Sequence, residues 1–88
     1  MADFYRNLST DDVVTLDRLS RLVLELRESR RELLARHGAE DEPALLERIR
    51  TGAAPEHPAY EDYLGARTIA ATCEEIRGEL KQFMLDLR

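Results

Sequence analysis

The stretch HGAEDEPALLERIRTGAAPEHP, residues 37–58, divides the sequence into three helical segments. Gly38 and Gly52 can adopt the left-handed conformation with which helices commonly end. Between them, Asp41 is a suitable N-cap, and the proline two residues later is acceptable only in a first helical turn. We therefore predict a short helix over residues 42–51, followed by a tight connector that contains two further prolines.

The segment before this stretch predicts one long helix over about residues 9–37. Ser9 is a favourable N-cap, and Asp12 occupies the position from which an acidic side chain completes a capping box. Apolar residues then recur in steps of three and four, which is the period of one helical face. These are Leu16, Leu19, Val23, Leu26 and Leu33, with Arg30 at the one polar position of the series.

The segment after the stretch predicts a second long helix over residues 58–87. From its ninth residue onward, apolar side chains follow alternating steps of three and four, which is a heptad-like seam. The seam consists of Ala66, Ile69, Cys73, Ile76, Leu80, Phe83 and Leu87. Because Cys73 lies within the seam, we expect a small buried core residue and not a reactive nucleophile.

The predicted fold is all-α, a single domain of residues 1–88 in which a long, a short and a long helix form an elongated antiparallel hairpin. Each long helix of about 28 residues would extend roughly 42 Å. Apolar residues cover an arc of about 200° on the first helix, whereas one partner helix covers roughly 100°. We therefore expect dimerisation into a four-helix bundle-like core. The expected interface residues are Val13, Leu22, Leu24 and Tyr60.

Composition and charge exclude several classes of function. A net charge of −5 argues against nucleic-acid binding, which needs a surplus of Lys and Arg on one face. One cysteine rules out an internal disulfide framework. The chain shows neither a secretory signal nor an apolar run that could span a membrane, so we expect a cytoplasmic protein. No cofactor motif occurs, and we expect no cofactor.

Two groups of residues are candidate ligand sites. Arginines crowd the end of the first helix in RESRRELLAR, and Arg27, Arg30 and Arg31 with Glu42 could bind a small anion. The alternative is a solvated helix face of mixed charge, because glutamates alternate with these arginines.

His37 and His57 are the second candidate group. In an antiparallel hairpin the end of the first helix lies near the start of the third, so the two imidazoles could approach one another and bind a metal. No helical spacing such as HxxxH fixes two ligands on one face, and no metal site is predicted from these residues.

One resemblance to a known family bears on function. The segments RRELLARHG and ALLERIRTG are similar to the end of the first helix and to the second helix of the all-helical chorismate mutases, over about a third of the chain. The resemblance implies a substrate-carboxylate role for Arg30 and an acidic site role for Glu42. The chain departs from the pattern where Val13 occupies the position of an early-helix arginine, and where the lysine after that helix and a glutamine of the third helix have no counterpart.

The expected function is that of a small cytosolic homodimeric accessory or regulatory subunit, which acts through protein–protein interaction with a possible larger protein partner. Its basis is the wide apolar arc of the first helix together with the lack of any convergent catalytic motif. The alternative is a chorismate-mutase-like enzyme or a small-anion binder.

Overall fold

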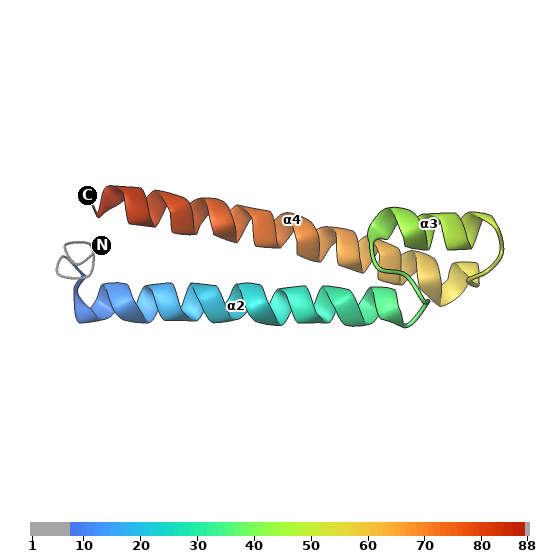
Figure 1. The fold of residues 1–88 in the computed structure, drawn as a ribbon, viewed down its shortest axis with the longest axis horizontal. Coiled ribbons are helices and arrows are strands. Elements are labelled where there is room, and N and C mark those ends of the chain that lie inside the picture. The colour runs from blue at the N-terminus through green and yellow to red at the C-terminus, as the bar shows by residue number, and fades with distance from the viewer. Residues whose placement is uncertain (1–7, 88) are drawn as a thin grey trace.

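The computed structural model describes residues 8–87 and contains three helices. They are α2 (Thr10–Ala35), α3 (Glu42–Arg50) and α4 (Glu56–Asp86). No strand occurs within these residues. The long helices α2 and α4 run antiparallel as a hairpin, and α3 lies between them in the chain (Figure 1). The predicted all-α order of long, short and long helix is confirmed.

The start of α2 follows the predicted capping box. The Ser9 hydroxyl accepts a hydrogen bond from the Asp12 backbone N–H at 3.0 Å, and the Asp12 carboxylate accepts one from the Ser9 N–H at 3.1 Å. The helix ends at Ala35, two residues before the predicted end. Gly38, with a φ of 70°, closes a Schellman-type turn in which the Ala39 N–H donates to the Leu34 carbonyl.

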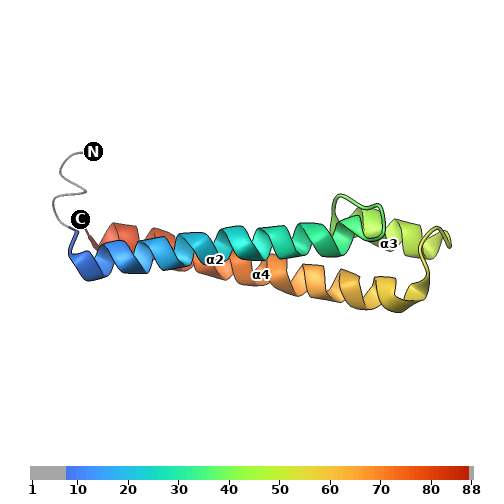
Figure 2. The same ribbon diagram turned by 90° about the horizontal axis from the view of Figure 1, so that it is seen from below.

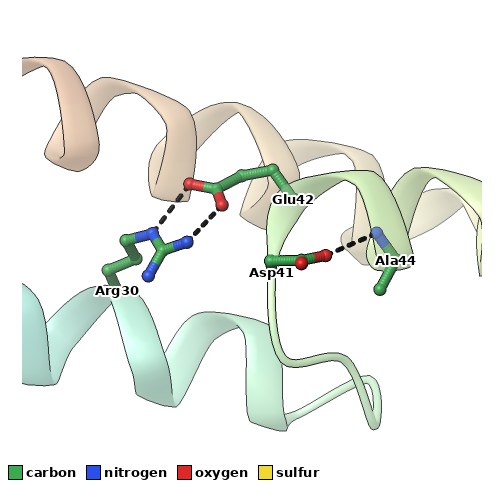
Figure 3. Close-up of polar contacts among 4 residues, drawn as sticks. All are labelled: Arg30, Asp41, Glu42 and Ala44. Carbon is green, nitrogen blue, oxygen red and sulfur yellow. Dashed lines mark hydrogen bonds and ion pairs between the residues drawn. The ribbon is translucent and has the colours of Figure 1, made fainter.

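The short helix α3 also has the predicted caps. Asp41 is the N-cap, and its carboxylate accepts a hydrogen bond of 2.8 Å from the Ala44 N–H (Figure 3). After the helix, Gly52 has a φ of 81°, and the Ala54 N–H donates to the Arg48 carbonyl. The helix is therefore bounded by short-range interactions that the sequence specifies.

The third helix, α4, begins with an irregular turn. His57 has non-helical angles (φ −112°, ψ 129°), so the regular helix starts at Pro58, as predicted. Every residue of the predicted seam is buried or half-buried, Cys73 included. Gly65 allows the two long helices to approach closely, because a Cβ atom there would lie 3.3 Å from Leu33 Cδ1.

The molecule is an elongated hairpin of 55 × 18 × 17 Å. Its radius of gyration is 17.5 Å, whereas a compact chain of this length has a value of about 12 Å. The helix α3 packs on one face of the hairpin, at the end where α2 stops and α4 starts (Figures 1 and 2). Within residues 8–87, no helix is both long enough and apolar enough to cross a bilayer.

The main buried cluster lies at this closed end of the hairpin. It joins residues of all three helices and of their connectors, namely Leu34, Ala39, Leu45, Ala54, Ala59 and Ala66. Four of these six are alanines, so the helices pack closely, and Leu34 and Leu45 provide the large apolar side chains. The core therefore fixes α3 against the closed end of the hairpin.

Candidate functional site

Arg30 and Glu42 form an ion pair between α2 and α3 (Figure 3). The Arg30 Nε donates to Glu42 Oε2 at 2.8 Å, and Nη2 donates to Oε1. The two side chains are only 30% and 14% exposed. The hydrogen bonds from Arg30 lower the pKa of the Glu42 carboxyl, and the carboxylate raises the pKa of the Arg30 guanidinium. The pair attaches the start of α3 to the middle of the hairpin.

The other two arginines of the predicted anion site, Arg27 and Arg31, lie on different parts of the surface. Arg31 pairs with Glu28 one turn earlier on its own helix, on an exposed surface, where the hydrogen bond lowers the pKa of the Glu28 carboxyl. Arg27 borders a surface hollow of about 280 Å³ between α2 and α4, which Arg30 also lines. The structure thus brings Arg27, Arg30 and Glu42 to one region and leaves Arg31 outside it.

Arg77 of α4, which was not among the predicted site residues, lines the same hollow. Its guanidinium Nη1 lies 3.9 Å from Glu74 Oε2, which is too long for a hydrogen bond. Glu74 itself also lines the hollow, and the remaining lining consists of Ala70 and Cys73. One signal could have identified Arg77: it follows the seam residue Cys73 by four positions, and residues four apart share one side of a helix.

His37 lies at the closed end of the hairpin and contacts the first turns of α4. Its Nε2 is 2.7 Å from Asp62 Oδ2, and both side chains are largely buried. The Arg36 guanidinium approaches the same carboxylate oxygen at 3.8 Å. The His37 carbonyl accepts a hydrogen bond of 2.6 Å from Arg48 Nε of α3. These contacts join the three helices, and they give His37 a structural role.

His57 pairs with a different acid from the one that His37 contacts. Its Nδ1 lies 2.5 Å from Glu61 Oε1, and both side chains are exposed. This contact contributes to lowering the pKa of the Glu61 carboxyl, after the larger effect of its backbone hydrogen bond. Within residues 8–87, no three His, Cys, Asp or Glu side chains are grouped so that they could hold a metal ion.

The four residues predicted at an interface all lie on the surface of the single chain. Val13, Leu22 and Leu24 of α2 are 51%, 40% and 64% exposed. Tyr60 of α4 is 43% exposed and stacks on Tyr63, with ring centroids 6.0 Å apart. Single exposed apolar residues are common in soluble proteins, so their arrangement, and not their number, decides what they indicate.

Comparison with known proteins identifies a family but no described activity. No curated protein and no solved structure match the sequence. The model of the Uncharacterized protein MJ0235 family matches residues 8–86, which is nearly the whole chain. The chain therefore belongs to the Uncharacterized protein MJ0235 family.

Proposed function

We propose that this protein is a small cytosolic homodimer that acts as an accessory or regulatory subunit through protein–protein interaction, without catalysis of its own. The observation that carries this proposal is the uneven distribution of the core. Among the described residues, no residue of α2 before Val23 and none of α4 after Ile76 is buried. In about half of the described hairpin, away from α3, the two long helices pack only on each other and enclose no buried core (Figure 1).

Two paired helices seldom bury enough apolar surface to be stable alone, because helices in proteins depend on tertiary packing of their apolar faces. In this open half, Val13, Val14 and Leu22 of α2 and Met84 and Leu85 of α4 are exposed. Val13 projects about 180° from Leu22 around α2, so one docking face covers only one of these two residues. Burying such side chains stabilises a protein by about 1.5–3 kcal/mol each when burial is complete. A second copy of the chain is the simplest source of the missing layer.

The second copy is proposed to dock on the face of the hairpin opposite α3. At about 100° per residue, Leu22, Leu26 and Leu33 lie within roughly 40° of one another around α2. Leu33 packs against Gly65 of α4, whereas its neighbour Leu34 belongs to the cluster under α3. The row from Leu22 to Leu33 therefore borders the face that α3 leaves open.

The helix α4 contributes apolar residues to the same face. Ile69, Ile76 and Phe83 recur every seven residues on the side of Gly65, and Ile69 and Phe83 are only half-buried in the single chain. The hairpin measures 55 Å by 18 Å, which leaves room for the roughly 800 Å² that each partner contributes to a standard interface. Two such faces packed together would form a four-helix core.

Sedimentation analysis of two single variants tests the dimer. Leu22 and Leu24 are both exposed leucines of α2, but they project about 200° apart around the helix. We expect the wild type to be a dimer at micromolar concentration and Leu22→Asp to be a folded monomer. Leu24 was expected at the interface from the sequence, but it lies off the face proposed here, so Leu24→Asp should remain a dimer. A stable monomer in the wild-type sample would end the dimer proposal, and dissociation by Leu24→Asp alone would place the interface on the other side.

The accessory role and the enzyme alternative need separate experiments. Affinity purification of the tagged protein from its own cells should recover one specific larger partner, and the Leu22→Asp variant shows whether that partner requires the dimer. The chorismate-mutase-like alternative is tested by a direct assay with chorismate. Turnover above the uncatalysed rate that is lost in Arg30→Gln would replace the accessory function with an enzymatic one.

A further inference from the structure

The hollow between α2 and α4 brings together arginines that lie far apart in the sequence. Arg27 and Arg30 come from α2 and Arg77 comes from α4. Ala70 and the buried Cys73 provide small apolar side chains between them. One of the lining residues, Arg30, pairs with Glu42 at the start of α3, as Figure 3 shows. Three arginines and one carboxylate, that of Glu74, thus line a surface that is partly apolar.

The positive charge of the hollow is only partly neutralised within the chain. Arg30 uses Nε and Nη2 for Glu42 (Figure 3), and its third nitrogen, Nη1, makes no hydrogen bond within residues 8–87. Arg27 makes no hydrogen bond or ion pair with any residue of this described part. Arg77 has only the long contact of 3.9 Å to Glu74, and its side chain is 52% exposed. The guanidinium N–H groups that remain unpaired can therefore donate hydrogen bonds to a ligand.

We propose that this hollow binds a small oxyanion, a phosphate or a carboxylate group of a ligand with few atoms. The planar guanidinium group matches the paired oxygens of phosphates and carboxylates and donates two parallel hydrogen bonds to them. A volume of about 280 Å³ lies at the lower end of ligand pockets, which restricts the ligand to a small one. Arg30, held in place by Glu42, needs little reorganisation to add a further donor.

The site goes beyond the proposed dimer and does not depend on it. The hollow lies on the side of the hairpin where α3 packs, since Arg30 contacts α3 and also lines the hollow. The face proposed for the second copy is the opposite one. Anion binding is therefore expected in the wild-type dimer and in the monomeric Leu22→Asp variant with similar affinity, so either proposal can fail without the other.

An NMR titration of the whole chain at constant ionic strength tests the site, with inorganic phosphate in one arm and acetate in the other. We expect saturable amide shifts at Arg27, Cys73 and Arg77, with a dissociation constant of about 1 mM or tighter. Saturation by phosphate alone identifies a phosphate group, and saturation by acetate alone identifies a carboxylate. Shifts that stay linear in both arms, or that spread over all arginines, would overturn the proposal.

Charge-matched variants separate this site from general attraction of anions. Arg27→Gln and Arg77→Gln should each weaken binding about threefold to tenfold, because each removes charged donors from a partly exposed site. Arg67→Gln removes the same charge from a different surface of α4, next to Leu64 and Thr68, and should leave the affinity unchanged. Equal weakening by all three variants, with the helical circular-dichroism signal retained, would show that no specific site exists.

Discussion

Arg30 of α2 and Glu42 of α3 meet through two parallel hydrogen bonds across 12 positions of the chain. Asp41, the N-cap of α3, immediately precedes Glu42, so the pair lies where the short helix begins. The buried cluster of Leu34 and Leu45 lies under the same helix. A part-buried ion pair and an apolar contact therefore act together to hold α3 on the hairpin.

Glu42→Gln should lower the free energy of unfolding by about 1–2 kcal/mol, because it leaves the part-buried Arg30 guanidinium without its charged partner. Chemical denaturation measures this change. Glu28→Gln is the matched control, since Glu28 pairs with Arg31 on the exposed surface of α2. An equal loss of stability in both variants would show that partial burial does not strengthen the Arg30–Glu42 pair.

Acid should weaken the same contact. The hydrogen bonds from Arg30 hold the pKa of Glu42 below its ordinary value of 4.5. A carboxyl whose pKa is lower in the folded state stabilises the fold above its unfolded pKa, and this contribution is lost as the pH falls through the folded pKa. We expect wild-type stability to fall as the pH drops below the ordinary carboxyl pKa of 4.5, and Glu42→Gln to lose less stability over the same change. Identical pH profiles would exclude Glu42 as a contributor.

Leu45→Ala should destabilise the protein by about 2–5 kcal/mol, because Leu45 is fully buried and its truncation leaves a cavity under α3. The neighbouring Leu46 is 43% exposed, and Leu46→Ala should change the stability by only about 0.5 kcal/mol. Urea denaturation followed by circular dichroism compares the two. A larger effect of Leu46→Ala would mean that α3 presents its other side to the core.

The two glycines within α4 should respond differently to alanine. A Cβ at Gly78 would meet no atom within 4 Å, so Gly78→Ala should stabilise the helix by about 0.5–1 kcal/mol through its higher helix propensity. A Cβ at Gly65 would lie 3.3 Å from Leu33 Cδ1, so crowding should offset that gain. Thermal unfolding gives the order of the two variants. A higher melting temperature for Gly65→Ala than for Gly78→Ala would contradict this packing.

Short-range signals were sufficient to predict the helices. The Ser9 and Asp41 caps and the positive φ angles at Gly38 and Gly52 depend on neighbours within a few residues, and all four were predicted. The ends of α2 and α3 come two residues and one residue earlier than predicted, because the backbone there changes to i→i+3 hydrogen bonds before Gly38 and Gly52. The heptad seam of α4 was also predicted, since it follows from helical periodicity alone.

The candidate sites depended on contacts between helices and were predicted only in part. The sequence suggested that His37 and His57 could meet, but in the structure His37 pairs with Asp62 and His57 with Glu61. Likewise, the arginine cluster of α2 was recognised from the sequence, whereas the position of Arg77 beside that cluster was not predicted. Sequence spacing places two side chains on one side of a helix, but it does not tell which side chain of another helix faces them.

The sequence by itself determined three helices, their order, their caps and the apolar seam, because these follow from backbone hydrogen bonding and from the 3.6-residue period of the helix. Only the tertiary structure decided that Arg31 turns toward Glu28 while Arg30 pairs with Glu42, and that Arg27 shares a hollow with Arg77. It also decided that the main buried cluster lies at the closed end and that burial stops at Val23 of α2 and Ile76 of α4. These features depend on how each helix is rotated about its axis, and the close packing of Leu33 on Gly65 and of α3 on Leu34 sets that rotation.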